Sequence, residues 1–279
     1  MRLRTTALKG MKESRTPIIC ITAYDYQIAS LVEQAGIDVI LVGDSLGNVV
    51  LGYDSTVPVT LDEMVHHTKA VMRGSKSALV VADMPFLTYN LSVENSLRNA
   101  GRLIQEGGAQ AVKIEGGQAV VETVHRLTEI GIPVMGHLGL TPQSVHQMGG
   151  YLIQGRTLTD AKKLMDDAKM LEQSGAFAIV LEGVPTELAK IITQDVSIPT
   201  IGIGAGENCD GQIQVINDIL GFSSRYPKHS KQYADMNAVI LQALNDYSHE
   251  VRMREFPASG HGSHMDPSIL SELLKGESI

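Results

Sequence analysis

Short apolar runs alternate with amphipathic stretches along most of this chain. Seven runs have the composition of buried strands, and they begin near Ile18, Val39, Leu79, Ala111, Val134, Ala178 and Thr200. A weaker eighth run covers residues 215–220. Near-continuous apolar strands that alternate with helices are typical of a parallel sheet with helices on its outer side.

The stretches between these runs have the features of helices. Thr60 and Glu63 form a capping-box pattern that opens one helix, and residues 118–130 place their apolar side chains on one helical stripe. Thr159 and Thr186 are expected to cap two later helices. Eight strand–helix units in this length favour a closed barrel over an open doubly wound sheet, since no strand is followed by a Gly-x-Gly-x-x-Gly turn.

A single (β/α)8 barrel, or TIM barrel, is therefore predicted for residues 1–257. Residues 1–15 precede the first strand and are expected either to plug the barrel bottom or to reach a neighbouring subunit. Residues 236–247 have a helical pattern and follow the barrel. Residues 258–279 form a polar tail in which Gly262 to Met265 match a protease-cleaved tag scar, so this tail is either appended or natural.

The composition narrows the class of protein. Hydrophobic residues make up 43% of the chain and charged residues 19%, which is enough to bury a sizeable core. A net charge of −8 argues against a nucleic-acid partner, whose binding surfaces are normally basic. No window approaches the roughly 18 consecutive apolar residues of a membrane span. Two cysteines and no signal peptide indicate a reduced, cytoplasmic protein.

Four of the strand-like runs end on an acidic residue: Asp44, Asp83, Glu115 and Glu182. In a closed barrel the carboxyl ends of the strands converge on one opening, called the mouth below. The first three acids end consecutive strands and would repel one another unless they shared a cation. We therefore expect Asp44 and Asp83 to bind Mg²⁺ directly and Glu115 to bind it partly through water. The alternative is that one or more of them caps a helix or pairs with Lys113.

The other polar residues near these strand ends suggest further roles. Lys113 and Glu115 share a face of one strand, so Lys113 forms either a structural ion pair or a substrate contact. Glu182 ends the sixth strand, across the barrel from Asp44, Asp83 and Glu115. It is free to act as a base or to cap the next helix. His137 is either a satisfied polar residue or a contact to substrate or to a metal ligand.

Several strings resemble one enzyme family. They are Thr22–Asp25, Leu41–Gly47, Asp54–Thr56, Ala82–Phe86, Val112–Gly117, Gly136–Ser144, Leu181–Pro185 and Ile201–Gly206. Together, from about residue 18 to 222 and more loosely to Pro257, they resemble the ketopantoate hydroxymethyltransferase family. The chain departs from the family pattern at residues 227–229 and 259–262.

The resemblance implies a Mg²⁺-dependent barrel of the phosphoenolpyruvate/pyruvate superfamily. Such an enzyme transfers a one-carbon unit from 5,10-methylenetetrahydrofolate to 3-methyl-2-oxobutanoate and gives 2-dehydropantoate, the first committed step of pantothenate and coenzyme A synthesis. It also implies a cytoplasmic homo-oligomer, typically a decamer.

Carried onto matching positions, the resemblance makes Asp44, Asp83 and Glu115 the metal set and Glu182 the proton acceptor. The contacts to the oxo acid would be Asp44, Ser45, Asp83 and Lys113. The residue types do not assign a pocket for the pterin of the folate.

Three other functions are compatible with part of the pattern. A Mg²⁺-dependent C–C lyase or aldolase of the same superfamily would use the same enolate, but such lyases usually carry a catalytic cysteine, and neither Cys20 nor Cys209 is well placed. A class I aldolase would need Lys113 as a Schiff base with a lowered pKa, whereas nearby carboxylates raise it. An inactive barrel kept as a scaffold predicts an incomplete metal set, and every expected position is filled.

Overall fold

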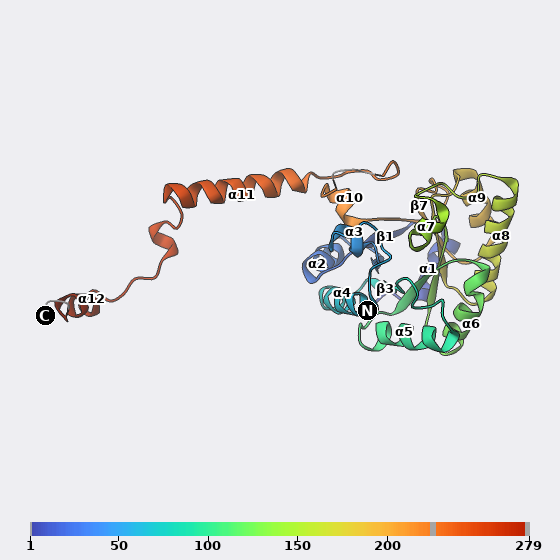
Figure 1. Cartoon of the computed structure of the whole chain (residues 1–279), viewed down its shortest axis with the longest axis horizontal. Helices are drawn as coiled ribbons and strands as arrows, with labels where there is room; N and C mark the ends of the chain where they lie inside the picture. The colour runs from blue at the N-terminus through green and yellow to red at the C-terminus, as the bar shows by residue number, and fades with distance from the viewer. Residues whose placement is uncertain (1, 224–226, 277–279) are drawn as a thin grey trace. The chain divides into compact units, whose positions relative to one another are not determined.

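A computed structural model describes residues 2–223 and 227–276 and contains a closed barrel of eight parallel strands (Figure 1). The strands neighbour one another in sequence order, and β8 pairs with β1 to close the ring. They are β1 (Ile18–Thr22), β2 (Val39–Val42), β3 (Leu79–Asp83), β4 (Ala111–Glu115), β5 (Val134–Gly139), β6 (Ala178–Glu182), β7 (Thr200–Ile203) and β8 (Gly211–Gln214). The predicted barrel fold is confirmed.

Helices occupy most connections and lie outside the strands (Figure 1). The longer ones are α2 (Tyr26–Gln34), α4 (Leu61–Gly74), α5 (Val93–Gln105), α6 (Val121–Glu129), α8 (Leu158–Gln173) and α9 (Thr186–Asp195). Each of these contacts the next one around the barrel. Shorter turns are α3 (Leu46–Val49), α7 (Val145–Met148), α10 (Ile216–Leu220), η1 (Gln118–Val120) and η2 (Pro142–Ser144).

The starts of three helices test the predicted caps. The capping box of α4 is present, with the Thr60 side chain accepting from the Glu63 N–H and the Glu63 carboxylate accepting from the Thr60 N–H. The cap predicted at Thr159 is wrong, because Thr157 caps α8 by accepting from the backbone N–H three residues later. The cap predicted at Thr186 is also wrong: this residue is the first of α9 and follows Pro185, which makes no side-chain cap.

The eighth strand lies earlier in the chain than predicted. β8 is Gly211–Gln214, whereas the run predicted at 215–220 contains α10. The prediction failed because β8 alternates buried and exposed positions, so Gln212 faces outward and the strand does not read as a continuous apolar run. Glycine is required at position 211, since a Cβ there would lie 2.4 Å from the carbonyl oxygen of Ile18 on β1.

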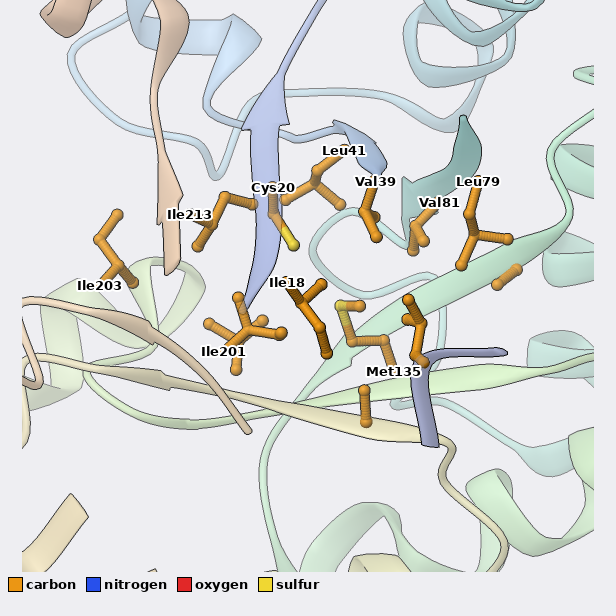
Figure 2. Packing of buried hydrophobic residues seen from close by; sticks show 14 residues of the cluster. Ile18, Cys20, Val39, Leu41, Leu79, Val81, Met135, Ile201, Ile203 and Ile213 are labelled. Atoms are coloured by element: carbon orange, nitrogen blue, oxygen red, sulfur yellow. The ribbon is translucent and has the colours of Figure 1, made fainter. Parts of the chain in front are cut away.

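Side chains that point into the barrel change from apolar to polar along the strands. The core cluster includes Ile18, Cys20, Val39, Leu41, Leu79, Val81, Ala111, Met135, Val180, Ile201, Ile203 and Ile213 (Figure 2). Alternate residues of a strand share a face. Two positions after Val81, Ala111, Met135 and Val180, the same face therefore carries Asp83, Lys113, His137 and Glu182. Polarity thus begins at one level of the barrel and continues to the mouth.

The N-terminal helix α1 (Thr5–Glu13) packs against the apolar end of this core. Leu8 is fully buried in the core cluster, and Leu3 and Met11 pack against it. Lys12 Nζ donates to the carbonyl oxygen of Thr193 at 2.8 Å and forms an ion pair with Asp210 at 3.0 Å. This segment therefore takes the first of the two placements that the sequence suggested, at the bottom of the barrel.

The chain divides into two compact units, Met1–Ile219 with Ser223–Gln232 and Leu220–Phe222 with Tyr233–Ile279. The second unit contains α11 (Met236–Met253), η3 (Ser259–His261) and α12 (Pro267–Gly276). Within it, the ring of Phe256 contacts those of Tyr247 and His261 at centroid distances of 5.7 and 5.0 Å. The predicted domain boundary at residue 257 remains a prediction and falls inside this unit. Among the helices of the described residues, none combines the length and apolarity that crossing a membrane requires.

The Glu33 carboxylate at the end of α2 holds the segment that leads into β3. It accepts hydrogen bonds from the Ser77 N–H at 2.6 Å, the Ser75 hydroxyl at 2.9 Å and the Ala78 N–H at 3.3 Å. Burial raises the pKa of Glu33, but these hydrogen bonds outweigh it and lower the pKa to about 2. The ionised form is thus favoured by folding.

Glu33→Gln is expected to lower the urea midpoint of unfolding at neutral pH. A carboxyl pKa that is lower in the folded state stabilises the fold above the unfolded value of about 4.5, and this contribution is lost as the pH falls towards about 2. The difference in midpoint between wild type and Glu33→Gln should therefore shrink between pH 6 and pH 3. Glu122→Gln, on the exposed side of α6, is the control. A difference that stays constant with pH would contradict the role given to Glu33.

Candidate active site

The C-terminal ends of β2 to β6 place polar side chains around one cavity of about 100 Å³. In the strand registers, Asp83 lies beside Lys113, Glu115 beside His137, and Gly139 beside Glu182. The cavity is lined by all the residues that the sequence singled out for a site, namely Asp44, Ser45, Asp83, Lys113, Glu115, His137 and Glu182.

Lys113 carries the buried positive charge of this cavity. Its Nζ lies 3.0 Å from Asp83 Oδ1, at an angle outside hydrogen-bond geometry, and 4.0 Å from Glu115 Oε1. Burial alone would lower the pKa of Lys113, but the charges of Asp83, Glu115 and Asp44 raise it above its usual range. Lys113 is therefore an ammonium group, and it cannot readily act as an amine nucleophile.

Asp44 and Asp83 are adjacent buried acids. The Asp44 N–H donates to Asp83 Oδ2 at 2.9 Å, so one acid orients the other. Burial, followed by the charges of Asp83 and Glu115, raises the pKa of Asp44. Burial also raises the pKa of Asp83, against the lowering effects of Lys113 and the Asp44 N–H. A cation between them would relieve the cost of keeping both acids ionised.

His137 lies between Glu115 and Glu182. His137 Nδ1 lies 3.3 Å from Glu115 Oε1, and its Nε2 lies 3.2 Å from Glu182 Oε2. Burial and the Lys113 charge lower the pKa of His137, but Glu115 and Glu182 outweigh them and raise the pKa to about 9. His137 thus lies between two carboxylates, and its Nδ1 also lies 3.2 Å from Lys113 Nζ. Its Nε2 is close to Glu182 but makes no hydrogen bond among the described residues. The position of Glu182 across the barrel had suggested that it is isolated from Asp44, Asp83 and Glu115. His137 instead lies between Glu182 and Glu115.

Glu115 is engaged by several donors. Burial raises the pKa of Glu115, but His137, Lys113 and the Gln143 N–H lower it below its usual range. The hydrogen bond from the Gln143 N–H to Glu115 Oε2 is 3.1 Å long. Gln143 occupies one oxygen of Glu115, and His137 and Lys113 lie near the other, so this ionised carboxylate offers fewer open positions than a free one.

Gln143 is a buried site residue to which the sequence gave no role. Its Nε2 donates to Asp44 Oδ2 at 2.8 Å and to the Met84 carbonyl at 3.0 Å, and its Oε1 accepts from the Tyr89 hydroxyl at 2.6 Å. The amide therefore fixes the orientation of Asp44. Its sequence signals are its place in the Gly136–Ser144 string and its position next to Pro142 in the turn after β5.

Two hydroxyl groups complete the wall of the cavity. Ser45 Oγ lies 2.8 Å from the Tyr24 hydroxyl, and burial raises the pKa of Tyr24, which stays a neutral phenol. Thr56 is only 3% exposed, and among the described residues its Oγ1 has no hydrogen-bond partner. A buried hydroxyl without a partner is costly unless a ligand or water satisfies it.

The donor set fits a small divalent cation with additional oxygen ligands. Within residues 2–223 and 227–276, no three His, Cys, Asp or Glu side chains are arranged to hold a metal ion by themselves. Because Glu115 is engaged by His137 and Gln143, the remaining oxygens of Asp44 and Asp83 are the best candidates for direct contact. Mg²⁺ commonly takes one or two carboxylates and completes its shell with water or substrate oxygens.

Comparison with known proteins gives this geometry a family. The family model described as ketopantoate hydroxymethyltransferase matches residues 2–259. A 3-methyl-2-oxobutanoate hydroxymethyltransferase of Dehalococcoides mccartyi (strain BAV1) is 58% identical over 99% of this chain and 99% of its own length. A protein of the same name from Carboxydothermus hydrogenoformans is 56% identical over 98% of this chain and 99% of its own.

Solved structures with the same fold are more distant in sequence. A 2,3-dimethylmalate lyase of the PEP mutase/isocitrate lyase superfamily aligns with a TM-score of 0.58 at 19% identity, covering 100% of this chain and 99% of that one. A phosphonopyruvate hydrolase in complex with oxalate and Mg²⁺ aligns with a TM-score of 0.59 at 13% identity, covering 98% and 95%. These two support the barrel architecture, whereas the match over residues 2–259 and the full-length relatives go further: the chain belongs to the ketopantoate hydroxymethyltransferase family.

Proposed function

We propose that this hydroxymethyltransferase moves a one-carbon unit from 5,10-methylenetetrahydrofolate to 3-methyl-2-oxobutanoate and forms 2-dehydropantoate, the first committed step towards pantothenate and coenzyme A. Family membership supports the overall activity. The observation that carries the finer proposal is the division of one small cavity between buried Asp44, Asp83 and Lys113 and the partly accessible Glu182, whose side chain is 17% exposed.

The reaction begins at the substrate carbon next to the ketone. Glu182 would take the C3 proton as a general base, and the electron pair of the broken C–H bond would delocalise onto the keto oxygen. The Lys113 ammonium would balance the negative charge that develops on the oxo acid. Mg²⁺ held by Asp44 and Asp83 would supply further positive charge at the substrate oxygens. The fold relative solved with oxalate and Mg²⁺ is consistent with this choice of ion.

The transfer then balances with one water molecule. One C–C bond forms between C3 and the donor methylene carbon, and one C–O bond forms from water. Both bonds from that carbon to folate nitrogens break. The proton from C3 and one hydrogen of water end on the two nitrogens, which leaves tetrahydrofolate.

A C–C lyase is the main alternative, because 2,3-dimethylmalate lyase shares the fold. It is disfavoured by the positions of the cysteines. Cys20 is 4% exposed within the core cluster, and Cys209 lies beside Gly202 on β7. Neither lines the cavity with Asp44 and Glu182. A Schiff base on Lys113 is disfavoured by the raised pKa of its ammonium group.

Cytoplasmic location and a homodecameric assembly belong to the same proposal. Both follow from the family resemblance, and sedimentation of the purified protein tests the assembly.

Glu182→Gln should abolish most of the exchange of the C3 proton of 3-methyl-2-oxobutanoate in D₂O, measured by proton NMR with Mg²⁺ present. The expected loss is about 10²–10⁴-fold, the usual contribution of a positioned base. Binding of the oxo acid should persist, because Asp44, Asp83 and Lys113 remain intact. Glu187→Gln, an exposed acid of α9, is the matched control. Unchanged exchange in Glu182→Gln would remove this residue as the base.

Asp83→Asn should raise the Mg²⁺ concentration needed for half-maximal exchange by at least roughly tenfold, since loss of even an outer partner of a metal costs about 10–100-fold in affinity. Calorimetric titration with Mg²⁺ alone gives an independent readout. Asp166→Asn, on the exposed side of α8, serves as the control. If the metal dependence of Asp83→Asn matches that of wild type, Asp83 is not a ligand.

A further inference from the structure

A second, larger cavity adjoins the small one at the mouth. It has a volume of about 800 Å³ and is called the outer chamber here. The two cavities share the wall residues Ser45, Thr56, Pro142, Glu182, Ile203 and Val215. A molecule in the outer chamber would therefore lie next to Glu182 and to any acid bound in the small cavity. The reaction proposed above needs a second substrate at this position.

One side of the outer chamber is apolar and open to solvent. Tyr151, Leu152 and Ile153 line it, and they are 58%, 56% and 57% exposed. Val49 and Leu140 add further apolar surface. Three consecutive exposed apolar side chains beside a catalytic cavity suit a ligand with a flat ring system, which would cover them.

A buried acid lies in the wall of the same chamber. Asp218 on α10 lines it and is only 7% exposed. Its Oδ1 accepts a hydrogen bond from the Ser223 hydroxyl at 2.8 Å. Within residues 2–223 and 227–276, no lysine, arginine or histidine forms an ion pair with it. A carboxylate has about four acceptor positions, so Asp218 can accept further hydrogen bonds from the N–H groups of a ligand in the chamber.

The buried hydroxyl of Thr56 is a second, independent indication of a ligand. It belongs to the wall between the two cavities and lacks a hydrogen-bond partner among the described residues. The outer chamber therefore combines an apolar side, a buried acceptor and an unsatisfied hydroxyl next to Glu182.

We propose that the outer chamber binds the pterin ring of the reduced-folate donor and that Asp218 accepts hydrogen bonds from its N3–H and 2-amino group. These two donors lie side by side in the ring plane, and a carboxylate can accept both in parallel, as it does from a guanidinium. The flat ring would cover the apolar side formed by Tyr151, Leu152 and Ile153. The exposed Lys228 and His229 at the rim suit the carboxylates of the glutamate tail. This inference rests on the proposed function, because it names the site of its second substrate.

The first test measures binding without turnover. Tetrahydrofolate is titrated calorimetrically into the full-length, Mg²⁺-loaded protein. Asp218→Asn should weaken its binding roughly 10- to 100-fold, since two hydrogen bonds to a charged group are impaired. The KM for methylenetetrahydrofolate should rise by a similar factor, while the KM for the oxo acid stays within about twofold.

Ser223→Ala is the matched control, because it removes the hydroxyl that donates to Asp218 and keeps the carboxylate. Tetrahydrofolate affinity of this variant should stay within about threefold of wild type. A loss as large as that of Asp218→Asn would mean that Asp218 acts only by holding the local structure, and it would overturn the inference.

A ligand change tests the same contact in the wild-type protein. An analogue with a 2-methyl group in place of the 2-amino group should bind at least about tenfold more weakly than tetrahydrofolate. Asp218→Asn should lose most of this discrimination. Equal binding of both ligands to wild type, or undiminished discrimination by the variant, would overturn the inference.

The outcomes also separate this inference from the proposed function. If wild type binds tetrahydrofolate and discriminates as expected but does not exchange the C3 proton, the pterin site stands and the oxo acid is wrong. If exchange occurs but tetrahydrofolate does not bind, the pterin site is wrong and enolisation stands.

Discussion

The ion pair between Lys113 and Asp83 is the interaction on which the mouth of the barrel depends. Both side chains are almost completely buried, at 4% and 2% exposure, and they lie on neighbouring strands in register. Without the ammonium group, the buried acids Asp44, Asp83 and Glu115 would lie in one small cavity without the positive charge of Lys113. The cost of that desolvation would drive them to take up protons. Lys113 lets the protein keep part of this negative charge.

The negative charge that remains uncompensated suits a divalent cation, and this cation together with Lys113 would attract an anionic substrate. Asp44 and Asp83 keep raised pKa values despite Lys113, so they favour any bound cation. Gln143 holds Asp44 through its amide and Glu115 through its backbone N–H, so the two acids cannot rotate apart freely. The site therefore combines pre-oriented carboxylate oxygens with a fixed ammonium group, and the proposed reaction would need little reorganisation of these groups.

The sequence predicted the side-chain positions that follow from alternation along a strand, and it missed the contacts that depend on loops. Asp83, Lys113, Glu115 and Glu182 could be placed at one mouth because each ends a buried strand and alternate residues share a face. β8 was missed because its outward residue is polar. The cap of α8 was misplaced by two residues, since Thr157 and Thr159 offer the same side chain. His137 and Glu182 lie on neighbouring strands but are 45 residues apart in the sequence, so no local pattern brings them together. The contacts of Gln143 come from a short turn after β5 that no periodicity describes.

The stacked apolar layers inside the barrel have a consequence for substrate choice. Leu41, Val180 and Ile213 belong to the core cluster and also line the small cavity. Their size sets the depth to which an acid can descend towards the barrel centre. A larger side chain at this level would shorten the usable space, and a smaller one would leave a void in the core. Folding stability and the length of the acid in the proposed reaction would therefore depend on the same few hydrocarbon groups, so neither could be altered there independently of the other.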